Sequence, residues 1–188
     1  MSEWGPLQAL AGAWEGNDGL DVSFHNAVGH VDKTPYVEKV HLKPFGPVDN
    51  GQQCLYGLDY RMAAWRHGEE NLNPFHTEVG YWLWDHTHHQ VLRCFVIPRG
   101  AVVLSGATCA DNARSFTLHS EAGRSDYGVL ENRYLGANAT TLRYECTVTV
   151  NSDGTWSYDE NSVVKILALD DEELHHTDRN TLHKVGDL

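Results

Sequence analysis

The segment from residue 141 to residue 150 reads Thr141-Leu142-Arg143-Tyr144-Glu145-Cys146-Thr147-Val148-Thr149-Val150. Apolar and polar side chains alternate along it, with the apolar ones at even positions. This period of two is typical of a β-strand that has one face in a core and one in water. The turn sequence Asn151-Ser152-Asp153-Gly154 follows and predicts a hairpin into the next segment, 155–169.

The same alternation recurs along most of the chain, between turn sequences such as Asp18-Gly19, Pro98-Arg99-Gly100 and Gly136-Ala137-Asn138. The one helix candidate is a single turn at Pro6–Leu10, and 17–33 reads as a long loop. We therefore predict an all-β fold, a single domain over 1–188, built as an antiparallel barrel or sandwich of about ten strands. The further predicted strands are 13–16, 35–45, 52–66, 76–84, 89–97, 101–107, 115–120 and 174–185.

The composition limits the classes of molecule that this protein is expected to bind. The 188 residues carry 26 Asp plus Glu against 14 Lys plus Arg, a formal charge of −12. This argues against nucleic acid and anionic membranes, which are bound through clustered Lys and Arg. No apolar run is long enough to span a bilayer and no secretory signal is visible, so we expect a cytoplasmic protein. Four cysteines without metal or redox spacing are expected to be reduced, with Cys54 and Cys146 at apolar positions.

Twelve histidines make this side chain the main source of candidate chemistry. On the strand 76–84, His76, Glu78, Gly80, Trp82 and Trp84 share one face. Two interpretations stay open: an exposed face with a His–Glu pair, or a ligand cavity with the tryptophan rings nearby. The segment Asp85-His86-Thr87-His88-His89 lies between two strands and is interpreted as a solvated turn rather than a metal site.

The last predicted strand contains His175 and His176. His176 shares a face with Leu174 and Leu182, which we expect to point inward. Nucleophile elbows and phosphate-binding loops are missing from the chain, so its sequence motifs give no independent evidence for a hydrolase or a nucleotide enzyme.

Several motifs occur in the order found in the nitrobindin family of haem-binding β-barrels. A short helix is followed by Gly12, Trp14, Gly16 and Gly19, then by a Tyr-x-Glu strand, then by His-x-Glu-x-Gly-Tyr, then by a Pro-x-Gly turn. The chain ends in a strand with histidines. The matching residues of the later motifs are Tyr36 and Glu38, then His76, Glu78, Gly80 and Tyr81, then Pro98 and Gly100, then His175 and His176.

This resemblance implies a fatty-acid-binding-protein-like barrel that holds ferric haem b through one histidine of the last strand. His176 is the implied iron ligand, with His175 as the alternative because the spacing is offset by about one residue, and Asp178 and Asn180 are candidates to orient it. The resemblance also implies contacts from His76, Glu78, Trp82 and Tyr36, nitric oxide binding, and isomerisation of peroxynitrite to nitrate. Whether the chain is an enzyme stays open.

Two other functions also remain open. One is a carrier of a small hydrophobic ligand, whose carboxylate would bind Arg93 with Tyr36 and Tyr60. The other is a barrel filled by its own tryptophan and tyrosine side chains, which acts at its surface or as a homodimer. The expected partner in the first two cases is a small molecule inside the barrel.

Overall fold

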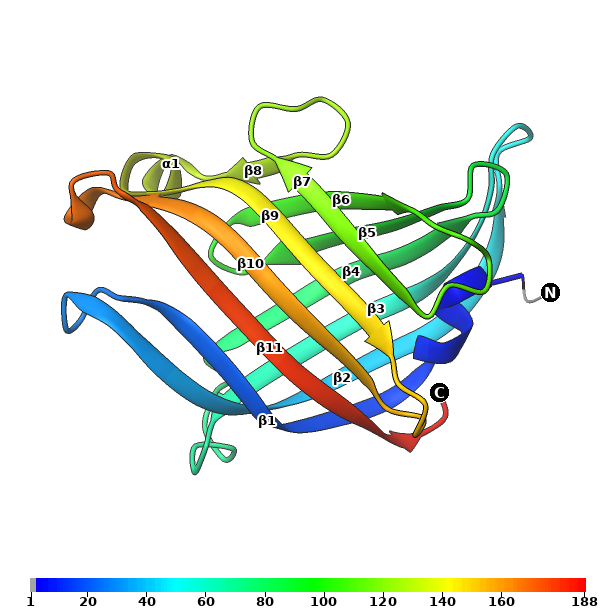
Figure 1. Ribbon diagram of the computed structural model, residues 1–188, viewed down its shortest axis with the longest axis horizontal. Helices are drawn as coiled ribbons and strands as arrows, with labels where there is room; N and C mark the ends of the chain where they lie inside the picture. The colour runs from blue at the N-terminus through cyan, green and yellow to red at the C-terminus, as the bar shows by residue number, and fades with distance from the viewer. Residues whose placement is uncertain (1–2) are drawn as a thin grey trace.

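The computed structural model, which describes residues 3–188, is a closed barrel of ten antiparallel strands with one short extra strand (Figure 1). Around the barrel the strands follow the order β5-β4-β3-β2-β1-β11-β10-β9-β7-β6, pairing of β5 with β6 closes the ring, and β8 pairs with β6. The strands are β1 (Gly12–His25), β2 (His30–Asp49), β3 (Cys54–Arg66), β4 (His76–Asp85), β5 (Gln90–Ile97), β6 (Ala101–Thr108), β7 (Ser115–Glu121), β8 (Val129–Glu131), β9 (Ala139–Val150), β10 (Trp156–Ile166) and β11 (Glu173–Gly186). The predicted fold class is confirmed.

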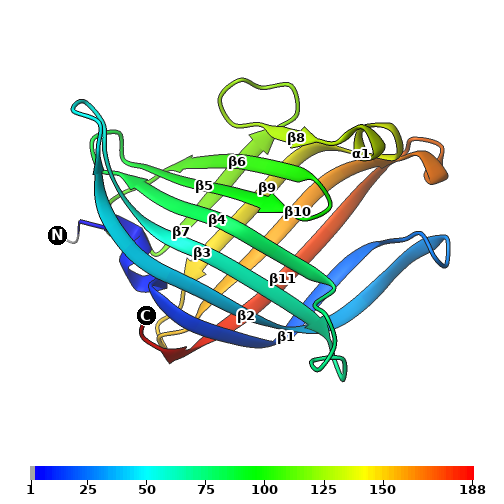
Figure 2. The same cartoon turned by 180° about the vertical axis from the view of Figure 1, so that it is seen from behind.

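One end of the barrel is closed by the 3₁₀ helix η1 (Gly5–Leu10), which confirms the predicted N-terminal helical turn (Figure 2). Leu7 and Leu10 are fully buried there. Trp14 packs beneath the helix, and its indole Nε1 donates to the carbonyl of Leu10 at 2.8 Å. Trp84 also lies at this end, against Gly5, where a Cβ would collide with its ring. The large aromatic rings therefore form a plug at the closed end.

The predicted loop over 17–33 is wrong. Strands β1 and β2 run through this segment and meet in a hairpin between His25 and His30. The register shifts between Gly16 and Gly19, so Asp18-Gly19 belongs to a bulge instead of a turn. Beyond the bulge, polar side chains such as Asp21 and Ser23 face the barrel interior. Here the inward-facing side chains are polar instead of apolar, so the alternation expected of a strand could not be recognised in the sequence.

Three smaller predictions also need correction. The expected turn at 136–138 is the end of a short helix, α1 (Arg133–Asn138), whose first turn is capped by the Asn132 side chain. The expected strand 155–169 ends at Ile166 and continues as the 3₁₀ turn η2 (Leu167–Leu169). Cys54 is exposed, whereas Cys146 is buried as expected, and all four cysteines are free thiols.

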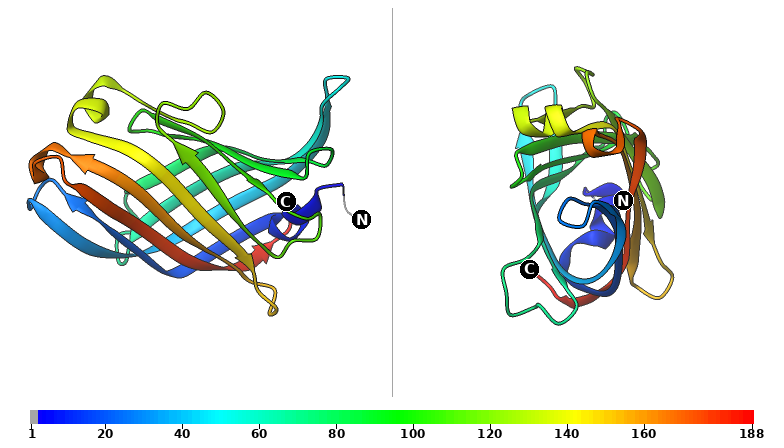
Figure 3. Two further views of the ribbon diagram at one scale, coloured as in Figure 1. Left: turned by 45° about the horizontal axis from the view of Figure 1, so that its top comes forward. Right: turned by 90° about the vertical axis from the view of Figure 1, so that its left-hand side faces the viewer.

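The barrel has two long walls. Figure 1 looks onto the wall of β9, β10 and β11, and Figure 2 looks onto the wall of β2, β3 and β4. The views in Figure 3 place η1 at one end and the β1–β2 hairpin with α1 at the other. No helix among residues 3–188 is long and apolar enough to cross a membrane.

Candidate functional site

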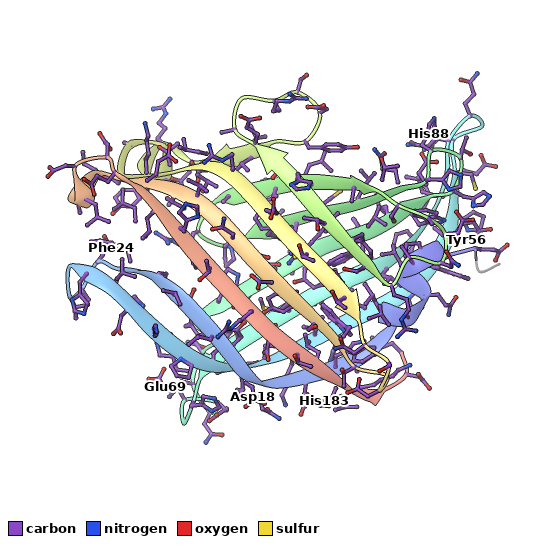
Figure 4. The ribbon with its side chains drawn as sticks, viewed as in Figure 1. Asp18, Phe24, Tyr56, Glu69, His88 and His183 are labelled. Carbon is purple, nitrogen blue, oxygen red and sulfur yellow. The ribbon has the colours of Figure 1, made fainter. Side chains whose placement is uncertain are left out.

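A cavity of about 490 Å³ occupies the barrel and extends toward the end formed by the β1–β2 hairpin and α1. Phe24, which lines it, and His88, beside the closed end, lie at opposite ends of the molecule in Figure 4. The volume lies within the range of natural small-molecule sites. The barrel is therefore not filled by its own tryptophan and tyrosine side chains, as the third possibility considered from sequence required.

His176 of β11 lines this cavity. Its Nε2 atom lies 2.6 Å from Asp21 Oδ1 on the neighbouring strand β1, and Ser23 donates to the other oxygen of Asp21 at 2.6 Å. Burial alone would lower the pKa of His176, but the hydrogen bond and negative charge of Asp21 raise it above its ordinary value. One ring nitrogen of His176 is thus held by a carboxylate, and the ring orientation is fixed.

His175 lies on the opposite face of the same strand. Its side chain is exposed, and its Nδ1 atom lies 3.1 Å from Asn161 Oδ1 on the outer surface of β10. His175 does not line the cavity. The alternation of β11 therefore separates the two histidines, one inside the barrel and one outside.

His76 and Glu78 line the cavity from β4, which is separated from β11 by β1, β2 and β3 in one direction around the ring. His76 Nε2 lies 3.2 Å from Glu78 Oε1. The other carboxylate oxygen of Glu78 lies 2.6 Å from an Arg93 guanidinium nitrogen and accepts from the Tyr60 hydroxyl at 2.7 Å. His76 and His176 thus enter the cavity from nearly opposite walls, and each contacts a carboxylate.

Arg93 is the centre of a buried ion-pair network. Besides Glu78 it contacts Glu160 at 3.0 Å and donates to the hydroxyl of Tyr144, and its guanidinium lies 4.3 Å from the Phe95 ring centroid. Burial opposes ionisation of Glu78, but the charge of Arg93 prevails and lowers the pKa of Glu78 to about 2. The sequence suggested Arg93 as a partner for a ligand carboxylate, but two carboxylates of the protein already occupy it.

A second network lies around Tyr36. Its hydroxyl bonds to Tyr158 and to Asp178, and the Tyr158 hydroxyl donates to Glu38 Oε1 at 3.0 Å. Asn180 also donates to Glu38, at 2.8 Å. Burial raises the pKa of Glu38 to about 7, although these two hydrogen bonds act in the opposite direction. Asp178 and Asn180 were expected to orient His176, but they belong to this network, and Asp21 contacts the imidazole instead.

The raised pKa of Glu38 has a consequence for stability. The ordinary pKa of this carboxyl group is 4.5, so the folded protein binds the Glu38 proton more tightly than the unfolded chain does. This tighter binding stabilises the folded state at low pH, and the stabilisation is lost as the pH rises through about 7. Relative to wild type, Glu38→Gln should gain up to roughly 3 kcal/mol in the free energy of unfolding between about pH 4 and pH 8. Urea titrations across this range measure the difference. Glu121→Gln, at an exposed position of β7, is the control, and its difference from wild type in the free energy of unfolding should not change with pH. A difference for Glu38→Gln that is also independent of pH would contradict the prediction.

The two tryptophans of β4 are placed differently. Trp82 lines the cavity, and the Arg93 guanidinium lies 5.1 Å from its ring centroid. Trp84, which was also expected near the cavity, packs under η1 and against His89, with ring centroids 6.3 Å apart. The last residues of β4 lie beyond the floor of the cavity. Trp82 and Trp84 therefore do share one face of the strand, as predicted, but Trp82 lines the cavity and Trp84 packs in the closed end.

The histidine-rich turn after β4 is a surface feature. His86 and His89 both contact the carboxylate of Asp111, at 3.2 and 2.7 Å, and His88 contacts Asp85 at 2.9 Å. Within residues 3–188 no group of three His, Cys, Asp or Glu side chains is arranged to hold a metal ion. The interpretation as a turn is confirmed.

Sequence reasoning missed the inward-facing residues of β10. Tyr158, Glu160 and Ser162 all line the cavity. Their even spacing is a visible signal, but this polar face was not recognised as an interior one, because a polar stripe on a strand usually faces water.

The residues of the cavity fit a haem group. An imaginary plane across the cavity would meet apolar and aromatic walls, and an imidazole is available on each of two nearly opposite sides. His176 also has the carboxylate partner that metal-bound histidines usually have. The walls include Val40, Met62, Phe75, Trp82, Phe95, Ile97, Val103, Val129, Leu135, Trp156, Val164 and Ile166.

Comparisons with known proteins agree with this geometry. The crystal structure of Rv2717c from M. tuberculosis superposes with a TM-score of 0.65 and 18% sequence identity, over 95% of this chain and 96% of that one. That likeness establishes the barrel fold. No curated protein sequence matches the chain. The model of the THAP4-like, haem-binding β-barrel domain matches residues 3–184, nearly the whole chain, and confirms both the resemblance inferred from the motifs and haem as the cofactor of the family. The chain therefore belongs to the family of THAP4-like haem-binding β-barrel domains.

Proposed function

We propose that this protein binds haem b inside the barrel, with His176 as the ligand of the iron. The observation that carries the proposal is the position of His176, which lines the cavity while Asp21 holds its Nε2 atom at 2.6 Å. Asp21 would fix the ring and increase the electron density on the imidazole, as carboxylates do behind metal-bound histidines. Family membership supports haem as the group that the cavity accommodates.

His76 is assigned to the other side of the cavity. Its contact with Glu78, itself held by Arg93, keeps the imidazole at a defined place on the β4 wall. The carboxylate also opposes the effect of burial and raises the pKa of His76 above its ordinary value, so the ring is available as a hydrogen-bond donor. Such a donor on the far side of the haem would stabilise a small polar ligand.

A titration with haemin tests the proposal. The Soret band should shift and sharpen relative to that of free haemin until one haemin is bound per chain, and the fluorescence of Trp82 and Trp156, which line the cavity, should be quenched in parallel. Absence of both signals at saturating haemin would refute haem binding, whatever residue is the ligand.

When bound, haem would supply an iron site for a diatomic ligand or an oxidant. From the resemblance to nitrobindins we propose nitric oxide as that ligand and isomerisation of peroxynitrite to nitrate as the activity. Addition of nitric oxide to the haem-loaded protein should shift its Soret band, and the yield of nitrate from peroxynitrite should rise above that of free haemin.

The alternative function, a carrier of a carboxylate-bearing lipid, has less support. Arg93 is paired with Glu78 and Glu160, so a ligand carboxylate would have to displace one of them from a buried site.

A further inference from the structure

The wall of the cavity carries two pairs of tyrosines. In the first pair, the hydroxyl oxygens of Tyr36 and Tyr158 lie 2.6 Å apart. In the second pair, the hydroxyls of Tyr60 and Tyr144 both contact the guanidinium of Arg93. Each of the four hydroxyls also donates a hydrogen bond to a carboxyl group of the protein. The two pairs therefore have similar acceptors, and they differ in the cation that contacts only the second pair.

The Tyr36–Tyr158 pair has a good acceptor for a phenolic proton. A buried ring that loses an electron becomes positively charged, which is costly unless its proton leaves as well. Tyr158 donates to Glu38 Oε1 at 3.0 Å. Burial raises the pKa of Glu38 to about 7, so its carboxylate binds a proton more tightly than an exposed one does. Oxidation of Tyr158 with proton transfer to Glu38 therefore removes a buried negative charge instead of creating a positive one.

The Tyr60–Tyr144 pair is harder to oxidise, because Arg93 acts on both its rings and its acceptors. Burial raises the pKa of Glu78, but the charge of Arg93 prevails and lowers it to about 2, so this carboxylate is a weak base. The guanidinium also lies 5.4 Å from the ring centroid of Tyr60 and 5.9 Å from that of Tyr144. A positive charge at this distance opposes the removal of an electron from either ring.

The two tryptophans of the cavity wall, Trp82 and Trp156, have no acceptor for their indole proton. Within residues 3–188 neither Nε1 atom has a hydrogen-bond partner. Loss of an electron from either indole would therefore leave a buried positive charge. Among the tyrosines and tryptophans of the cavity wall, the Tyr36–Tyr158 pair is thus the easiest to oxidise.

The position of this pair brings it close to the site assigned to haem. The hydroxyl of Tyr36 donates to Asp178, which lines the cavity from β11. Asp178 is two residues from His176 on the same strand, a distance of about 7 Å along β11. Electrons cross gaps of this size between aromatic groups in proteins, so the pair is within reach of an oxidant that reacts at the haem.

We propose that the Tyr36–Tyr158 pair is a redox-active site that supplies an electron when hydrogen peroxide reacts at the bound haem, and this inference rests on the proposed haem binding. Cleavage of the O–O bond to give two water molecules takes up two protons and two electrons. Solvent supplies the protons, the iron supplies one electron, and Tyr158 supplies the other while its phenolic proton passes to Glu38. Two molecules of a small one-electron donor, such as ascorbate, then reduce the iron and Tyr158, and Glu38 returns the proton. The pair would thereby add a peroxidase activity to the barrel.

Electron paramagnetic resonance of the haem-loaded protein tests the inference. The Soret band of each sample is recorded first, and the sample is then mixed with one equivalent of hydrogen peroxide and frozen. Wild type should give the signal of a neutral tyrosyl radical, and the signal should narrow when the protein is made with ring-deuterated tyrosine. The double variant Tyr36→Phe with Tyr158→Phe should bind haemin but lose the signal, because both rings remain and only the hydroxyls are removed.

The double variant Tyr60→Phe with Tyr144→Phe is the matched control and should keep the signal of wild type. Glu38→Gln keeps all four phenols but removes the proton acceptor, so it should lower the yield of radical without changing the Soret band of bound haem. A wild type that binds haem but gives no tyrosyl signal would overturn the inference, and so would equal signals from the two double variants. An unchanged yield in Glu38→Gln would overturn the role of Glu38. A wild type that binds no haemin would be recognised before peroxide is added, and it would overturn the proposed function together with this inference.

Discussion

His176→Ala will not develop the Soret band of histidine-ligated haem after addition of haemin, whereas His175→Ala will bind haemin as wild type does. The two residues are adjacent, but β11 places the first in the cavity and the second on the outer surface. His176 is the one histidine of the described strand β11 that lines the cavity, so His176→Ala removes the proposed bond between this imidazole and the iron. The adjacent variant controls for any effect of replacing a histidine in this strand.

Loss of the band in His176→Ala could also follow from a collapsed cavity. His176→Gly with added imidazole separates the two causes, because free imidazole can enter the space left by the side chain and restore the band if ligation was the missing function. Retention of the band in both alanine variants would remove β11 as the source of the ligand. Loss of the band in His175→Ala alone would contradict the proposed assignment.

Much of the fold could be predicted from the pattern of apolar residues. The segment 141–150 forms β9, with Tyr144, Cys146 and Val148 buried as the alternation required. The first hairpin could not be predicted in the same way. Its interior side carries Asp21, Ser23 and His25, so hydrophobic periodicity gives no signal where the strand lines a polar cavity. The failure in prediction therefore coincides with the candidate site.

The site itself was partly predictable. The spacing of His76 and Glu78 placed both on one face of a strand, and the structure brings them together at 3.2 Å. The partner of His176 could not be found, because Asp21 lies 155 residues away in sequence and meets it only through the register of β1 against β11. Arg93 was recognised as an interior cation, but its partners were not. Glu78 comes from the neighbouring strand β4, whereas Glu160 comes from β10 and reaches Arg93 only because the barrel is closed.

Arg93→Met should destabilise the protein by about 3–5 kcal/mol, the usual cost of removing one partner from a buried ion pair. Methionine keeps most of the length of the arginine stem, so the change chiefly removes the charge. Glu78, which is 4% exposed, would then remain as a buried carboxylate that keeps Tyr60 and His76 as partners but loses its cation. Denaturant unfolding monitored by tryptophan fluorescence measures the loss.

Arg143→Met is the matched control, because Arg143 also pairs with a glutamate, Glu173, at 3.3 Å, but on the exposed surface of the barrel. Exposed pairs contribute about 0–1 kcal/mol, so the control should change stability little. The double variant Arg93→Met with Glu78→Gln should recover part of the loss, since the neutral amide no longer requires the guanidinium. A loss below about 1 kcal/mol in Arg93→Met would mean that water reaches Glu78 when the cation is removed, and the cavity wall would then be far more hydrated than its burial indicates.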